Sequence, residues 1–207
     1  RYALTANHAK HLALVDYILQ DAFFARIFND LNDYGHEIKF SAFGGAGAYI
    51  PFALDTEKLD STDKQEQFTR GFMAMHAQGH IKARFTLSFW LGAHGNAHSL
   101  LHEMMHFYQD LHGLYLTPLK EQGAAPNILD AKSEIVAILF LEAWAQTEAI
   151  RTSWALAQKG ADLGWRGALT SPDWKALARF YDAELQSGKD ESVAAANTLR
   201  QWYLGKH

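Results

Sequence analysis

The chain has 207 residues, of which 48% are apolar and 20% charged, and its formal net charge is -4. This length and balance predict one soluble globular domain over residues 1 to 207, and an acidic chain without a basic cluster argues against a nucleic-acid partner. The sequence contains no cysteine, which excludes disulfides, thiolate metal ligands and a cysteine nucleophile. The sequence does not determine the cellular compartment of the protein, although it slightly favours the cytoplasm.

The N-terminal part of the chain combines a helical pattern with short extended stretches. Apolar residues recur at helical spacing through residues 7 to 32, so we expect one long helix there, bent near Asp21. The segment EIKFSAF, residues 37 to 43, alternates and predicts a strand, whereas the run GGAGAY after it predicts a turn or an irregular edge. A capping-box pattern at Thr62 predicts a short helix that ends at about His76.

The remaining elements are dominated by helices. The segment IKARFTLSFWL, residues 81 to 91, alternates strictly and predicts a strand with one buried face. After the break GAHGN, Asn96 is suited to cap a helix over residues 97 to 112. Asn127 is a second cap, and residues 128 to 159 contain neither glycine nor proline, which predicts one long helix. Two further helices are expected over residues 171 to 186 and 191 to 203.

These elements predict an α+β fold, in which helices surround a small sheet of at least two strands. The longest apolar stretch, residues 135 to 145, is too short to cross a bilayer and is interrupted by Glu142. We therefore expect no membrane span in this chain.

The expected helix after GAHGN carries three histidines four residues apart, His98, His102 and His106, with Glu103 directly after the second. Residues four apart share one face of a helix, so His102 and His106 can converge on one ion. His98 is two turns from His106, roughly 12 Å along the axis, and cannot share that ion. HEMMH is thus a His-Glu-x-x-His pattern, in which two imidazoles hold Zn²⁺ and the glutamate takes a proton from bound water.

A catalytic zinc normally takes three protein ligands, so a third must come from another element. The long helix over residues 128 to 159 offers Glu134, Glu142 and Glu148. Glu142 lies inside the apolar run IVAILFLEAWA, where a buried carboxylate without a partner would cost several kcal/mol. We therefore favour Glu142 as the third ligand. The structural alternative is an ion pair with an arginine, or a rim position with a solvated head group.

HEMMH followed by a helix with Glu-Ala-x-Ala, starting at Glu142, resembles the gluzincin pattern. More narrowly, the chain resembles a family of predicted bacterial metallopeptidases described only as a domain of unknown function, in which a glutamine, here Gln109, follows HExxH. The resemblance covers roughly residues 38 to 203. It implies a zincin-like fold, with helices packed on a small mixed or antiparallel sheet and an active-site helix followed by a long glutamate-bearing helix. It also implies four site residues: the metal ligands His102, His106 and Glu142, and the base Glu103.

Two positions depart from better-known zinc peptidase patterns. His112 lies at the offset of the third metzincin histidine, but Gln109 stands where that motif has a glycine, so we discount it. Gln146 lies four residues after Glu142, where better-known gluzincins place an acidic residue that orients a histidine. This departure leaves undetermined which side chains orient the histidine ligands.

The sequence thus favours a zinc-dependent metallopeptidase that hydrolyses peptide bonds in a peptide or protein substrate, with Glu103 as the general base. The alternative is a non-catalytic zincin-like domain that mediates interactions or binds metal without turnover. A di-iron bundle needs Glu-x-x-His twice, whereas the chain contains it once. The oligomeric state is left open, and so is the oxyanion donor, for which the candidates are Tyr49, His112, Tyr115 and Tyr203.

Overall fold

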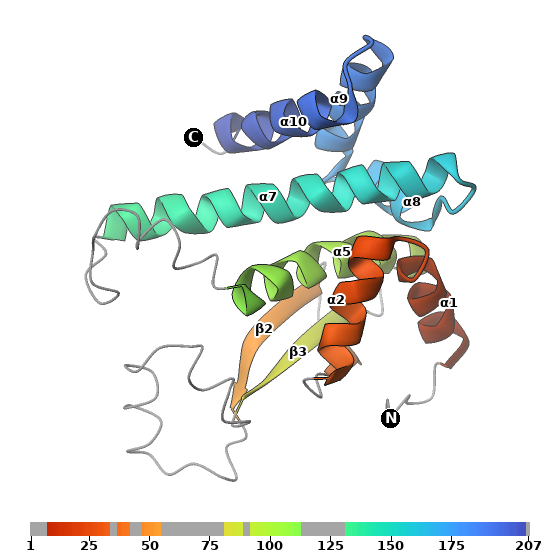
Figure 1. The fold of residues 1–207 in the computed structure, drawn as a ribbon, viewed down its shortest axis with the longest axis vertical. Helices are drawn as coiled ribbons and strands as arrows, with labels where there is room; N and C mark the ends of the chain where they lie inside the picture. The colour runs from red at the N-terminus through yellow and green to blue at the C-terminus, as the bar shows by residue number, and fades with distance from the viewer. Residues whose placement is uncertain are drawn as a thin grey trace.

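The computed structural model describes residues 8–33, 37–41, 47–54, 81–88, 92–112 and 131–205. The elements in chain order are α1 (His8–Ile18), α2 (Ala22–Asp33), β1 (Glu37–Ser41), β2 (Gly47–Leu54), β3 (Ile81–Ser88), α5 (Gly92–Leu111), α7 (Ala131–Gln158), α8 (Leu163–Thr170), α9 (Lys175–Gln186) and α10 (Glu191–Gly205) (Figure 1). The short helix predicted from Thr62 to His76 lies outside the described residues.

The N-terminal helical segment consists of two helices, α1 and α2, separated at residues 19–21. The single bent helix predicted over residues 7 to 32 is therefore wrong. The Asp21 oxygen Oδ1 accepts hydrogen bonds from the backbone amides of Phe23 and Phe24, each with a donor–acceptor distance of 3.0 Å. This arrangement caps α2 by satisfying amides that the first helical turn leaves without a partner. Asp21 thus starts a new helix.

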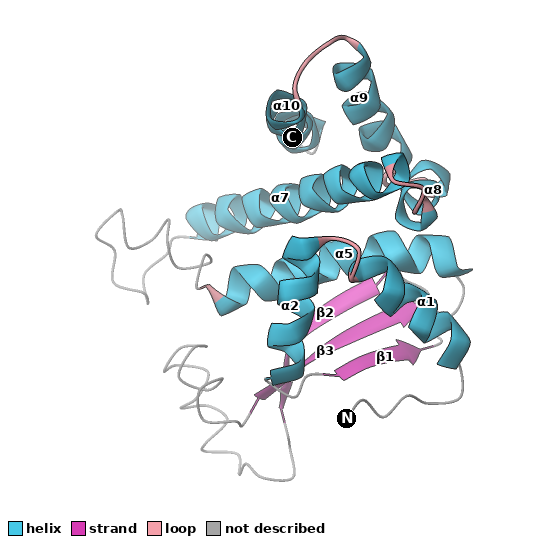
Figure 2. Cartoon of the chain, turned by 45° about the vertical axis from the view of Figure 1, so that its right-hand side comes forward, coloured by secondary structure: helices cyan, strands magenta, loops and turns pink. Residues whose placement is uncertain are grey.

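The strands form one sheet in the order β1-β3-β2, with β1 parallel and β2 antiparallel to β3 (Figure 2). β1 and β3 confirm the strands predicted at residues 37 to 43 and 81 to 91, as far as the structure describes those ranges. For GGAGAY, residues 44 to 49, a turn or an irregular edge was predicted; its described part, from Gly47, belongs to β2, which lies at an edge of the sheet. The register of β2 shifts between Ile50 and Ala53, around Pro51, which has no N–H to give to the ladder.

α5 is the central helix and lies between the sheet and α7 (Figures 1 and 2). It begins at Gly92, so the GAHGN segment is helical, and Asn96 is buried inside the helix instead of capping it. The close packing of α8 against α5 explains why a glycine occupies position 167. A Cβ added to Gly167 of α8 would collide with the carbonyl oxygen of His94 and would press on the backbone of Gly95. Glycine therefore permits the approach of α8 to α5.

α7 confirms the long helix predicted over residues 128 to 159, as far as the structure describes that range, and α9 and α10 cover the side of α7 away from α5 (Figure 1). α8 was not predicted from the sequence. It follows a turn in which Gly160 has a φ of +92°, a conformation that favours glycine. Among the described helices, none combines the length and the apolar character needed to cross a membrane.

Among the described residues, most of the buried apolar side chains form two clusters, and both consist of helical residues. The larger one joins α1, α2, α5 and α7, and the smaller one joins α7, α9 and α10. In α5, four apolar residues of the HEMMH region are at most 1% exposed: Leu100, Leu101, Met104 and Met105. A helix that is buried around most of its circumference holds its polar side chains in fixed surroundings.

The predicted α+β class needs correction. Of the residues whose side chains the structure describes, 85% are helical and none belongs to a strand. The described side-chain packing is therefore that of helices on helices, with α5 at its centre. Alternating apolar residues indicated where strands form, but they could not show that the buried clusters are formed between helices.

Candidate metal centre

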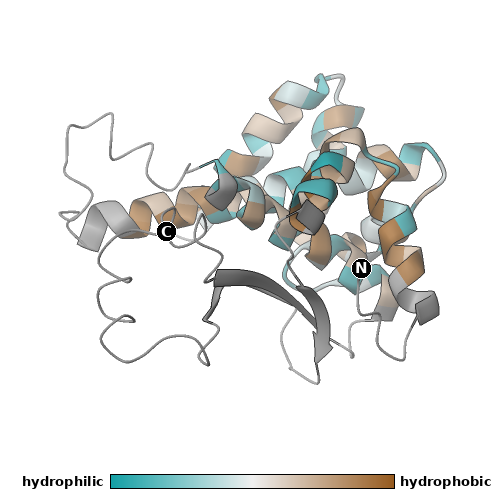
Figure 3. Cartoon of the chain, turned by 60° about the horizontal axis from the view of Figure 1, so that its bottom comes forward, coloured by the Kyte–Doolittle hydropathy of each residue, from teal (hydrophilic) through white to brown (hydrophobic). Residues whose placement is uncertain are grey.

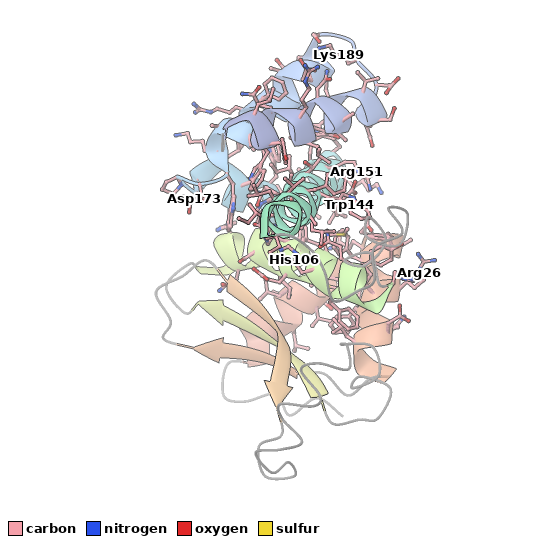
Figure 4. The ribbon with its side chains drawn as sticks, turned by 90° about the vertical axis from the view of Figure 1, so that its left-hand side faces the viewer. Arg26, His106, Trp144, Arg151, Asp173 and Lys189 are labelled. Atoms are coloured by element: carbon pink, nitrogen blue, oxygen red, sulfur yellow. The ribbon has the colours of Figure 1, made fainter. Side chains whose placement is uncertain are left out.

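The candidate site lies where α5 faces α7. The two helices run antiparallel, because His98 of α5 meets Gln146 of α7, whereas Gln109 further along α5 meets Leu141 earlier in α7. This direction brings the middle of α5, with the HEMMH motif, next to Glu142. Figure 4, which views α7 nearly end on, shows His106 at the junction of the two helices.

Three side chains converge on one point between these helices. Nε2 of His102 lies 3.1 Å from Oε1 of Glu142, and Nε2 of His106 lies 3.0 Å from Oε2 of the same carboxylate. The two imidazole Nε2 atoms are 3.1 Å apart. Among the described residues, these three form the group of histidine and carboxylate side chains that could hold a metal ion.

The surroundings of Glu142 differ from those expected from the sequence. Its side chain is 40% exposed, so the premise of a deeply buried carboxylate is wrong. The first half of α7 is apolar (Figure 3), yet Ile135, Ile138 and Phe140 on it are exposed. The direction of the Glu142 side chain, towards both histidines, distinguishes it from Glu148, which pairs with Arg151.

The other residues considered as metal ligands bind different partners or lie outside the described residues. Glu148 forms an ion pair with Arg151, with 2.7 Å between the carboxylate and the guanidinium. The Glu134 side chain lies outside the described residues. His112 is exposed and packs its ring against Tyr108, with 4.3 Å between ring centroids. His98 is fully buried and binds Gln146 and Ser153.

Of the four proposed oxyanion donors, Tyr115 and the side chain of Tyr49 lie outside the described residues. Tyr203 belongs to α10, which packs on the side of α7 away from α5 (Figure 1). The identity of the oxyanion donor stays a prediction.

The electrostatics of the site couple Glu142 to the histidines. Burial acts to raise the pKa of Glu142, but its contacts with His102 and His106 outweigh that effect and hold the pKa well below its ordinary range. Burial acts to lower the pKa of His106, yet the hydrogen bond and the charge of Glu142, together with the Glu103 charge, raise it above the ordinary value. The site thus favours a cation beside the Glu142 carboxylate.

The spacing and chemistry of the donor atoms fit a metal ion. Two ligand atoms that each lie 2.0 to 2.1 Å from a tetrahedral zinc are about 3.3 Å apart. The two Nε2 atoms are 3.1 Å apart, and each lies 3.0 to 3.1 Å from a different oxygen of the Glu142 carboxylate, which is close to that value. A slight outward movement of the three side chains would therefore suffice for ligation, and two imidazoles with a carboxylate form a common zinc ligand set.

Glu103 does not belong to the group of three but lies beside it. Its side chain is buried, at 7% relative exposure, and its charge contributes to the raised pKa of His106. A carboxylate next to the donor atoms, on the helix that carries two of them, can act on a water molecule held there.

Gln109 is the residue whose contacts the sequence analysis missed. Its amide oxygen lies 3.0 Å from Nδ1 of His106, and its amide nitrogen donates a hydrogen bond to the Leu141 carbonyl, at 2.9 Å. The signal that could have found it is its spacing, since a residue three positions after His106 lies on the same side of a helix.

A protein-family model, described as "Putative metallopeptidase family (DUF6782)", matches residues 82–207, which is more than half of the chain. The chain belongs to this metallopeptidase family. The match includes both α5 and α7, and so it covers every residue of the His-His-Glu group. No curated protein and no solved structure matches the chain. Family and geometry together suggest a metal-binding hydrolase.

Proposed function

We propose that the protein is a zinc-dependent metallopeptidase, with His102, His106 and Glu142 as the metal ligands and Glu103 as the general base. The observation that carries the proposal is the convergence of two imidazole nitrogens and one carboxylate within 3.0 to 3.1 Å of one another. The metallopeptidase family of residues 82–207 supports peptide bonds as the substrate class.

Zinc is the metal that suits this donor set best. Magnesium and calcium prefer sites built from oxygen ligands, whereas two imidazoles and a carboxylate are typical of zinc. Cysteine is absent from the chain, so sites with thiolate ligands are excluded. Three protein ligands would leave one tetrahedral position open, as catalytic zinc sites do.

The proposed chemistry divides the work between the ion and Glu103. When bound, the ion supplies a more acidic water molecule and polarises the substrate carbonyl. The Glu103 carboxylate accepts the proton of the attacking water and later returns it to the leaving amine. Burial of Glu103 limits the conformations that its side chain can adopt.

The test compares the wild-type chain with Glu103→Gln and with the control Glu148→Gln, whose position lies on α7 outside the group of three. Each protein is loaded with zinc, assayed for metal by elemental analysis, and incubated with a peptide library whose cleavage is followed by mass spectrometry. We expect about one zinc in all three and at least a 100-fold lower turnover in Glu103→Gln alone.

Equal turnover in the wild type and Glu103→Gln would remove the assigned base. If the wild type binds zinc but cleaves nothing in the library, the metallopeptidase proposal fails. That result would support the non-catalytic metal-binding domain.

A further inference from the structure

Gln109 connects the second histidine of HEMMH to the neighbouring helix. It is 1% exposed, lies three residues after His106 on α5, and reaches the backbone of α7 at Leu141. The proposed chemistry gives it no part, since it neither belongs to the His-His-Glu group nor carries a charge.

The Leu141 carbonyl determines how the Gln109 amide is oriented. A carbonyl oxygen can only accept a hydrogen bond, so the amide nitrogen of Gln109 must face it, at 2.9 Å. The amide oxygen then faces Nδ1 of His106, at 3.0 Å, and can only accept. The hydrogen in this contact must therefore belong to Nδ1 of His106.

This hydrogen decides which nitrogen of His106 is available to a metal ion. In a neutral imidazole one nitrogen carries the hydrogen and the other carries the lone pair. With the hydrogen on Nδ1, the lone pair is on Nε2, which faces Nε2 of His102 and Oε2 of Glu142. Gln109 thus selects the tautomer of His106 that ligation requires.

His102 provides a comparison within the same site. Its Nδ1 atom is buried and has no hydrogen-bond partner among the described residues. Of the two Nδ1 atoms, only that of His106 therefore has a hydrogen-bond partner among the described residues, and this partner is Gln109. Because Leu141 directly precedes Glu142, the same amide also anchors α5 to the backbone beside the third proposed ligand.

We propose that Gln109 is a positioning residue of the metal centre, which holds His106 in the Nδ1–H tautomer and fixes α5 against α7 next to Glu142. The inference rests on the proposed zinc site and assigns a role to a residue outside the ligand set. Groups that bind the second nitrogen of a ligating histidine typically change metal affinity 10- to 100-fold when they are removed.

The experiment compares Gln109→Met with Gln109→Glu and with the control Gln146→Met. Methionine has a similar length but cannot replace either hydrogen bond, whereas glutamate keeps an acceptor for His106. Gln146 is a matched control because it is also a buried glutamine, at 3% exposure, and also binds a histidine, His98, which lies outside the group of three. Circular dichroism is used to verify that each variant is folded.

Zinc affinity, measured by competition with a chromogenic chelator, is the first readout. We expect Gln109→Met to bind zinc roughly 10- to 100-fold more weakly than the wild type. Gln109→Glu should lie much closer to the wild type, and Gln146→Met should leave the affinity unchanged. An affinity of Gln109→Met within twofold of the wild type would overturn the proposal while leaving the zinc site intact.

The tautomer of His106 is the second readout and needs no metal. Nitrogen NMR of the metal-free chain, recorded at a pH where the rings are neutral, distinguishes Nδ1–H from Nε2–H imidazole. In the metal-free ring the Glu142 carboxylate, which can only accept, favours a hydrogen on Nε2 and so opposes Gln109. We therefore expect a larger Nδ1–H fraction at His106 in the wild type than in Gln109→Met. If the wild type bound no zinc, the proposed function would fail, but an unchanged tautomer in Gln109→Met would still separately refute the role of Gln109.

Discussion

Gln146 donates a hydrogen bond to His98 across the α5–α7 interface, with 3.0 Å between Nε2 of the amide and Nε2 of the imidazole. The other ring nitrogen of His98, Nδ1, lies 3.2 Å from the Ser153 hydroxyl, to which it can donate. All three side chains are buried. A neutral ring thus satisfies both contacts, whereas a second ring proton would replace the lone pair that accepts from Gln146.

Acid should therefore destabilise the fold through His98. Burial, aided by the charge of His102, lowers the pKa of His98 to about 3, compared with 6.5 for the unperturbed group. The unfolded chain binds this proton as the pH falls through 6.5, and the folded chain does so only near 3. The contribution of His98 to the free energy of unfolding is therefore fully present above pH 6.5 and is lost progressively as the pH falls towards 3.

Urea unfolding between pH 6.5 and 4, with a metal chelator present, measures this effect. The wild type should lose free energy of unfolding more steeply than His98→Gln, by up to about 1.4 kcal/mol per pH unit. His94→Gln serves as a control because His94 is exposed on the same helix. Identical slopes for the wild type and His98→Gln would contradict the prediction.

Zinc should stabilise the folded chain, because the proposed ligands join α5 to α7 and come together only on folding. Free zinc at 100 times its dissociation constant would add about 2.7 kcal/mol to the free energy of unfolding. Thermal unfolding with zinc, with chelator and after re-addition of zinc measures the shift. His106→Ala should show no such dependence, and a wild-type melting temperature insensitive to zinc would count against the shared site.

Glu142→Ala should weaken zinc binding strongly, whereas Glu148→Ala should not. Glu142 faces both histidines, while Glu148, on the same helix, forms an ion pair with Arg151. Isothermal titration of zinc into each variant separates the two glutamates. Equal losses of affinity would mean that charge on α7, and not ligation by Glu142, determines binding.

Gly167→Ala should destabilise the fold because the added Cβ would meet the backbone carbonyl of His94, which cannot move aside without shifting α5. Overpacking of this kind typically costs about 1 to 3 kcal/mol. Gly205→Ala is the control, since a Cβ there meets no other atom within 4 Å. Chemical denaturation of both variants gives the difference, and a Gly167→Ala chain as stable as the wild type would show that α8 can move away.

Local patterns predicted the elements that carry the site. HEMMH placed His102 and His106 on one helical face, because that property depends only on residues a few positions apart. The long helix that carries Glu142 was predicted in the same way, from a run without glycine or proline.

Two local predictions failed, one because a neighbouring helix changes the outcome and one because a side chain forms a cap. Gly95 suggested a break before α5, but the helix continues through it because α8 packs against that backbone. Asp21 suggested a bend, although its carboxylate caps a separate helix.

The sequence by itself determined which residues have the chemistry to bind a metal, whereas the tertiary structure decided which of them meet. The antiparallel alignment of α5 and α7 places Glu142, and not Glu148, opposite His102 and His106. It also places Gln109 against the Leu141 carbonyl and so orients its amide towards His106. The alignment of two helices depends on how all their side chains pack together, and no short stretch of sequence contains that information.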